Sequence, residues 1–285
     1  SGFLALCSKN LPTPAIKKPT EHFNTVLYQG SGAVDKDVTG VGFDPDMTWI
    51  KARSQAYDHV LTTATVGVGY IVQPNDNSVQ ADWTDYVGPY ITDGIRLNDV
   101  QQGDAVNESG RNYVMWNWKA NGSGGANSDG AQATVVSANT TAGFSIVTGT
   151  GTGSSTTYGH GLGVEPKIII IKSRSGADDW YFFTSAIDGI PYNTWQYSKL
   201  NTETAFASSV EVASNTTTFA ANYTNGVTFV AYCFAEVAGF SQFGIYEGTG
   251  SSNGPHKNLN FRPGWLMLKE ISTDDRGWSV FDTKR

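Results

Sequence analysis

Charged residues, cysteines and long apolar runs are all scarce in this chain of 285 residues, and each scarcity excludes a class of protein. Asp, Glu, Lys and Arg make up 16% of the residues and the net charge is −7, which argues against a nucleic-acid-binding surface. The two cysteines, Cys7 and Cys233, are too few for a secreted disulfide framework, and no Cys/His cluster has zinc spacing. The notable apolar run, residues 168–171, is far too short to cross a membrane.

Glycine and aromatic residues, by contrast, are abundant, with 32 Gly, 8 Trp, 13 Tyr and 14 Phe. Short apolar or β-branched runs stand between Gly, Pro and polar residues, a pattern typical of strands. Asn-Gly and Asp-Gly pairs supply the left-handed positions of tight turns. Because no stretch shows a sustained helical period, the sequence predicts an all-β fold of tandem β-sandwich, jelly-roll-like domains of about 100 residues each.

A repeated frame divides the chain. In three places a Gly-x-Gly pair is followed 15 residues after its first glycine by Pro, and six residues later by Lys; the Pro and Lys pairs are Pro45 and Lys51, Pro166 and Lys172, and Pro263 and Lys269. We therefore expect β-domain copies at 21–120 and 142–238 and a partial, truncated third copy at 239–285. Residues 1–20 are predicted to be a connector from the end of an upstream region, and the Gly/Ser/Asn-rich residues 121–141 a flexible joint.

The repeated lysines end an apolar strand in every copy. We interpret them as the points where the strands emerge into water, with a shared binding site as the alternative.

Residues suited to catalysis or metal binding do not form recognisable motifs. The four histidines are widely separated, and none lies in a zinc or nucleophile motif: His22, His59, His160 and His256. Asp44 and Asp46 flank Pro45 and are candidate calcium ligands, but the second copy has Glu165 and Lys167 at these positions, which argues against a shared calcium site. We predict no catalytic residue, no metal and no cofactor.

Two segments, 80–90 and 188–197, interleave aromatic rings with Asp and Asn. Such rings suit the apolar wall of a sugar site, while the polar groups suit its hydroxyls. The alternative is that the rings plug the ends of the sandwiches or form subunit contacts. The candidates for glycan binding or an interface are Trp83, Asp85, Tyr86, Tyr90, Tyr192, Trp195 and Tyr197.

Several strings together resemble a repeated domain of bacteriophage virion proteins, found in tail-fibre or related structural proteins of phages that infect cyanobacteria and other aquatic bacteria. These strings are residues 21–28, 42–54, 113–120, 137–147, 159–167 and 230–236. The resemblance covers about residues 10–285. It implies a non-enzymatic virion structural protein, a tail fibre or adhesin contributing to host attachment, located in the tail or another exposed surface of the virion.

The resemblance also implies partners. Fibre proteins are usually homotrimers, so we expect self-association, contacts with other virion proteins, and exposed loops that meet host cell-surface glycans. The repeats are expected to stack end to end as rigid spacers, with no nucleic acid bound and no membrane insertion. Alternatives are a head decoration (cement) protein, a glycan-binding or depolymerase module with paired carboxylates, and a bacterial surface adhesin.

Overall fold

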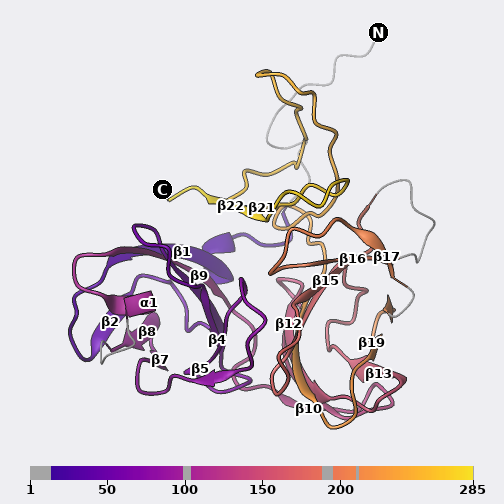
Figure 1. Ribbon diagram of the computed structural model, residues 1–285, viewed down its shortest axis with the longest axis horizontal. Helices are drawn as coiled ribbons and strands as arrows, with labels where there is room; N and C mark the ends of the chain where they lie inside the picture. The colour runs from indigo at the N-terminus through magenta and orange to yellow at the C-terminus, as the bar shows by residue number, and fades with distance from the viewer. Residues whose placement is uncertain (1–13, 99–103, 188–194, 210–211, 285) are drawn as a thin grey trace.

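The computed structural model describes residues 14–98, 104–187, 195–209 and 212–284, and these residues form an all-β fold (Figure 1). Helical structure within them is limited to the 3-10 turn η2 (Pro19–Glu21) and the single turn α1 (Asp104–Asn107). No helix in this part of the chain is long and apolar enough to cross a membrane. The expected all-β sandwich class is confirmed.

Unit 1 (residues 23–118) is a sandwich of two antiparallel sheets. The large sheet has the order β1 (Phe23–Gln29), β9 (Asn112–Trp118), β3 (Met47–Ala52), β4 (Val60–Thr63), β5 (Tyr70–Val72) and β6 (Ala81–Asp82). The small sheet has the order β2 (Lys36–Thr39), β8 (Gly94–Leu97) and β7 (Val87–Ile91). The nested pairing of β1 with β9 and of β2 with β8 is that of a long hairpin folded over into two sheets, as in a jelly roll.

Unit 2 (residues 125–234) has the same plan. Its large sheet has the order β10 (Gly125–Asn127), β11 (Thr134–Asn139), β12 (Phe144–Thr150), β20 (Thr228–Phe234), β14 (Ile168–Ser173), β15 (Tyr181–Thr184), β16 (Trp195–Lys199) and β17 (Ala207–Ser209). Its small sheet is β13 (Ser155–Gly159), β19 (Thr218–Asn222) and β18 (Ala213–Ser214). From β12 to β17 the strand order repeats that from β1 to β6 in unit 1, so the two units share one topology.

Residues 121–141, expected to be a flexible joint, instead contribute β10 and β11 to the large sheet of unit 2. The Ser137 hydroxyl donates to the Gly122 carbonyl at 2.8 Å and accepts from the Asn121 N–H at 2.7 Å. The Asp46 carboxylate in unit 1 accepts from the N–H groups of Ala120 at 2.6 Å and Gly122 at 3.0 Å. The Gly and Asn residues therefore form turns that are hydrogen-bonded to both units.

The third repeat frame forms a hairpin of β21 (Trp265–Leu268) and β22 (Ser279–Asp282). In Figure 1 this yellow hairpin lies over the junction between unit 1, in indigo and purple, and unit 2, in magenta and orange. Residues 1–13 of the predicted connector lie outside the described residues. Within the described part of that connector, Ile16 is buried and the Ala15 N–H donates to the Ala238 carbonyl at 3.3 Å.

Both faces of each large sheet are buried. In β14, Ile169 and Ile171 point into the sandwich of unit 2, while Ile168 and Ile170 point into a second cluster shared with unit 1 and the hairpin. A strand covered on both faces reads as a continuous apolar run, which is what residues 168–171 show. The units therefore pack with their large sheets face to face, and this replaces the expected end-to-end stack.

Candidate functional site

The aromatic candidates of unit 1 lie at the edge of its core. The rings of Trp83 and Tyr86 meet edge to face with centroids 6.0 Å apart, and both pack against the core of unit 1. The Tyr90 hydroxyl donates to the Thr62 carbonyl at 3.1 Å, and burial raises the pKa of Tyr90 far above its ordinary value. Asp85 is exposed, and its backbone carbonyl accepts from the Asn98 side chain at 3.0 Å.

The aromatic candidates of unit 2 belong to a different core. Trp195 is buried inside the sandwich of unit 2, and half-buried Tyr197 packs beside Phe183 with centroids 6.1 Å apart. Tyr192 lies outside the described residues. The structure thus places the candidates of the two units in separate clusters and does not assemble them into one site.

Two of the three repeated lysines, Lys172 and Lys269, join the units instead of these rings. Lys172 of unit 2 is completely buried, and its Nζ donates to the Asn77 carbonyl of unit 1 at 3.0 Å and to the Asp178 carbonyl at 2.7 Å. Burial lowers the pKa of Lys172. Its interpretation as a strand end emerging into water was wrong, because unit 1 covers the end of that strand.

The lysine of the third frame makes the same contact one unit further along. The Lys269 Nζ donates to the Glu203 carbonyl of unit 2 at 2.8 Å and also to the Arg276 carbonyl of its own turn. Lys172 and Lys269 therefore each contact one carbonyl of their own turn and one carbonyl of the preceding unit.

A tryptophan follows each of these lysines and donates to the same preceding unit. The indole N–H of Trp180 donates to the carbonyls of Gln73 at 2.8 Å and Asp76 at 3.1 Å. The indole N–H of Trp278 donates to the Lys199 carbonyl at 3.0 Å. The sequence carried a signal for this contact, because both tryptophans stand just before a strand at a matching place in the repeat.

We call residues 73–80 of unit 1 and 199–206 of unit 2 the linking loops, since both receive these donors. A backbone bond completes each contact: the Gln80 N–H donates to the Arg174 carbonyl at 2.9 Å, and the Phe206 N–H to the Ile271 carbonyl at 3.3 Å. The two loops share one further hydrogen bond, in which an Asn side chain of the loop accepts from a backbone N–H of the same unit. The side-chain oxygens of Asn75 and Asn201 accept from the N–H groups of His59 and Trp180, both at 2.8 Å.

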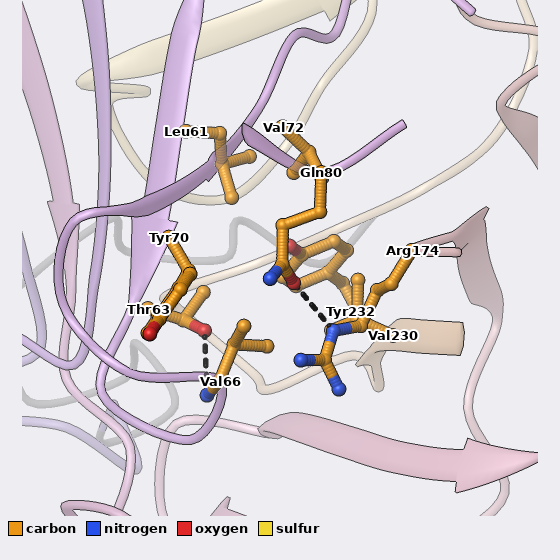
Figure 2. Close-up of a pocket in the computed structure, with 9 residues that line it drawn as sticks. All are labelled: Leu61, Thr63, Val66, Tyr70, Val72, Gln80, Arg174, Val230 and Tyr232. Carbon is orange, nitrogen blue, oxygen red and sulfur yellow. Dashed lines mark hydrogen bonds between the residues drawn. The ribbon is translucent and has the colours of Figure 1, made fainter. Parts of the chain in front are cut away.

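A small space lies within the contact between units 1 and 2 (Figure 2). Figure 2 shows Arg174 Nε donating to the Gln80 side-chain oxygen, a distance of 2.7 Å. The buried hydroxyl of Tyr232 also lines the space and has no hydrogen-bond partner among the described residues. Because the space cannot hold even a water molecule, it is a packed seam between units and not a ligand site.

A larger, open pocket of about 230 Å³ lies where unit 1, unit 2 and the hairpin meet. Its walls include Trp49 and His59 of unit 1, Leu200 and Glu203 of unit 2, and Trp278 and Val280 of the hairpin. Glu203 supplies the one carboxylate among the lining residues.

The electrostatics of this pocket centre on His59. The Trp49 indole N–H donates to His59 Nδ1 at 2.8 Å. Burial, together with the charge of Lys51, lowers the pKa of His59 to about 4, and Asp58 partly offsets this effect. The ring is therefore neutral at pH 7, and its proton is on Nε2.

A second histidine, His160, is held by hydrogen bonds inside unit 2. His160 is buried; its Nε2 lies 3.1 Å from the Asn215 carbonyl, and its Nδ1 accepts from the Leu162 N–H at 3.2 Å. In the described part of the chain, no group of three or more His, Cys, Asp or Glu residues is placed to hold a metal ion.

Comparison with known proteins gives one match. Residues 18–285 match a family model described as a domain of unknown function, DUF7483. No curated protein and no solved structure matches the chain.

Proposed function

Since the chain belongs to the DUF7483 family of domains of unknown function, we propose a function from its own residues and contacts. The proposal is a non-enzymatic structural protein of a bacteriophage virion, which contributes to host attachment as part of a tail fibre or a related adhesin. The observation that carries it is the repeated inter-unit contact made by Lys172 with Trp180 and again by Lys269 with Trp278.

This contact holds the units rigidly together, as a structural protein requires. Hydrogen bonds from a charged group contribute roughly 1.5–3 kcal/mol each, and removing one partner leaves a buried polar group unsatisfied. The units are also joined by a shared apolar cluster that draws on both large sheets. A body held together in this way transmits force between its ends, as a fibre or a virion surface requires.

The assignment to a virion is supported by the resemblance in residues 21–28, 42–54 and 113–120 to the repeated domain of phage structural proteins. The proposal includes self-association, with a homotrimer as the expected form, and location in the tail or another exposed part of the particle. Light scattering would show a trimer as three times the chain mass of 30.6 kDa.

A glycan-binding module is the second candidate, and the open pocket favours it. Trp49 and Trp278 offer apolar walls, while Asn75, Asn201 and Glu203 offer polar groups, the mixture typical of small-ligand sites. A depolymerase would additionally use two carboxylates about 5–10 Å apart, whereas Glu203 is the one carboxylate of this pocket. A head decoration protein would share the rigid fold but contact capsid subunits.

Mass spectrometry of purified particles tests the proposal directly. Particles produced from a genome that encodes this chain should contain it, and immunogold labelling should place it on the tail. Labelling of the head would favour the decoration protein. Absence from particles together with presence in the bacterial envelope would overturn the virion assignment in favour of a bacterial adhesin.

A further inference from the structure

Units 1 and 2 each end on a strand that lies inside their large sheet. In unit 1 this strand is β9, between β1 and β3, and in unit 2 it is β20, between β12 and β14. We call β9 and β20 the closing strands. Alternate side chains of a closing strand point into the sandwich of its own unit and into the apolar cluster that the units share. In β20 the two sets are Phe229, Ala231 and Cys233, and Val230 and Tyr232.

The third frame, residues 239–285, contains the neighbours of a closing strand but, among its described residues, no closing strand. β21 occupies the place of β3 and β14, because it follows the Pro of the frame. Residues 243–250 occupy the place of β12, since Phe243 matches Phe144 at its start, yet they form no strand. Both segments therefore lack the partner that would lie between them.

The edge of β21 that faces away from β22 is unpaired. Among the described strands, β21 pairs only with β22. The Thr283 N–H donates to the Gly264 carbonyl at 3.1 Å, and antiparallel pairs alternate, so the backbone groups of Leu266 also face β22. Those of Trp265 and Met267 face the opposite edge, where no described residue hydrogen-bonds to them.

Apolar side chains border this edge on both faces of the hairpin. Trp265 and Met267 pack against the shared cluster. On the other face Leu266 and Phe281, which lie opposite each other across the hairpin, are 38% and 54% exposed. The counterpart of Leu266 in unit 2, Ile169, is completely buried. A strand that fits this edge therefore carries apolar side chains on both of its faces.

The N-terminus of the chain carries a further copy of the closing-strand pattern. Residues 3–7 read Phe-Leu-Ala-Leu-Cys, and residues 229–233 of β20 read Phe-Val-Ala-Tyr-Cys. Lys9 stands after this run at the place that Lys119 holds after β9. The run also precedes β1 of the next unit, just as β9 precedes β12. One chain thus holds a closing-strand sequence without a unit, and a frame without a closing strand.

The described residues that follow this run are bound where the third frame begins. The Ala15 N–H donates to the Ala238 carbonyl at 3.3 Å. Pro14 lies so close to Gly239 that a Cβ on this glycine would come within 2.9 Å of the Pro14 Cβ. Residues 9–13, which join Pro14 to the run, extend over at most about 18 Å. This short tether keeps the run close to the third frame of its own chain.

We propose that residues 3–8 are the closing strand of the third frame and dock, antiparallel, on the free edge of β21 in the same chain. The register follows from that of β20 on β14. It places Ser8 opposite Trp265 and Leu6 opposite Met267, with backbone hydrogen bonds in both pairs.

The docked strand satisfies both faces of the hairpin and both of its neighbours. Leu4 and Leu6 join the shared cluster, as Val230 and Tyr232 do in unit 2. Phe3, Ala5 and Cys7 lie on the face of Leu266. Residues 243–250 pair with the other edge of the docked strand, as β12 pairs with β20. The N-terminal end of the chain is thereby held by its C-terminal part.

A disulfide tests this register directly. Cys7 lies opposite Leu266 in a pair without hydrogen bonds, whose Cα atoms are about 4.5 Å apart, a separation that suits a disulfide. Leu266→Cys should therefore form a disulfide with Cys7 under mild oxidation. The matched control is Phe281→Cys, whose exposed side chain lies one strand further away, at about 10 Å from Cys7. Mass spectrometry of peptides from the unreduced protein identifies the linked residues.

We expect linkage of Cys7 within one chain in the Leu266→Cys protein and none in the Phe281→Cys protein. No linkage, or equal linkage in both variants, would overturn the proposal. A disulfide-bonded dimer on a non-reducing gel would overturn docking within one chain, in favour of strand exchange between copies.

A second pair of variants leaves the native cysteines in place. Leu6→Tyr supplies the residue that β20 has at this place, whereas Leu6→Asp brings a charge to the shared apolar cluster. Hydrogen exchange at the amides of Trp265 and Met267 reports docking, because these N–H groups face the edge. We expect exchange at least about tenfold faster in Leu6→Asp than in Leu6→Tyr or the unaltered protein.

A chain without residues 1–8 should exchange as fast at these two amides as the Leu6→Asp protein, and both should melt at a lower temperature than the unaltered protein. Equal exchange in the truncated and unaltered chains would show that residues 3–8 do not bind β21 and would contradict the proposal.

Discussion

The Lys172 Nζ of unit 2 donates to the Asn77 carbonyl of unit 1 at 3.0 Å, although the lysine is completely buried. A buried ammonium loses its hydration, and here two carbonyls replace part of that water. The nearby carboxylates of Asp178, Asp76 and Asp179 favour its charged form, although desolvation outweighs them and lowers its pKa. The lysine is thus a polar group on which the contact between the units depends.

Replacing this lysine should destabilise the protein far more than replacing its counterpart in unit 1. We expect Lys172→Met to lower the free energy of unfolding by about 2–4 kcal/mol, because the carbonyls of Asn77 and Asp178 lose a charged donor at the contact between the units. Half-buried Lys51 bonds only to its own turn, so Lys51→Met should cost about 1 kcal/mol or less. Urea denaturation followed by tryptophan fluorescence measures both, and equal losses would contradict the inter-unit role of Lys172.

The stability that the hydrogen bond between Arg174 and Gln80 contributes should depend on the charge at position 80. Gln80→Ala removes the acceptor of Arg174 Nε and should cost about 1–2 kcal/mol of unfolding free energy. Gln80→Glu keeps the acceptor and adds a negative charge beside the guanidinium, so it should restore stability and add up to about 1 kcal/mol. The three proteins are compared by denaturation at low and at high salt. A Gln80→Glu protein less stable than Gln80→Ala would show that the seam does not tolerate the charge.

Protonation of His59 should destabilise the fold in mild acid. Its pKa is about 4 in the folded chain and about 6.5 when unfolded, so the unfolded state binds more protons between these values. Stability is therefore fully present above pH 6.5 and decreases as the pH falls to about 4, by up to about 3 kcal/mol. Buried His160, whose pKa is also lowered, acts in the same direction.

Denaturation midpoints measured from pH 4 to 7.5 test this dependence. The His59→Gln protein should lose less stability across the range than the unaltered protein, because the contribution of His59 is removed while those of His22 and His160, whose pKa values burial also lowers, remain. An unchanged slope would mean that His59 is not buried as a neutral ring.

Cys233 should report unfolding. It is buried, and burial raises the pKa of its thiol to about 12. In a Cys7→Ser chain at pH 8, the folded protein should react with a thiol reagent at least about a thousandfold more slowly than the denatured protein, because almost no thiolate is present and the reagent has no access. Rapid labelling of the folded chain would show that β20 is exposed by local opening.

The sequence pattern predicted where the strands lie better than it predicted which elements pack against them. The repeated Pro-to-Lys spacing located β3, β14 and β21, and the short apolar runs with flanking Gly and Pro predicted an all-β chain. The continuous run at 168–171 predicted a strand, but its pattern did not say that another unit covers the second face of that strand. Lys172 was misread for that reason: a lysine at the end of a strand is exposed unless another unit covers it.

Composition misled at residues 121–141. Gly, Ser and Asn are as frequent in tight turns as in flexible linkers, and here they flank the short strands β10 and β11. The sequence could not predict the open pocket either, because its walls come from three segments far apart in the chain. Only the place of Trp180 and Trp278 within the repeat hinted that these side chains share a role.

The direction of the inter-unit contacts matters for how the chain is made. Donors at Lys172 and Trp180 reach back to the loop 73–80, and those at Lys269 and Trp278 reach back to the loop 199–206. During synthesis, each receiving loop therefore leaves the ribosome before the side chains that bind it. Domains generally fold as they emerge, N-terminal first. The receiving loop of the preceding unit can therefore be folded before the next unit binds it. Assembly of the three parts can keep pace with translation and needs no late rearrangement of an earlier part.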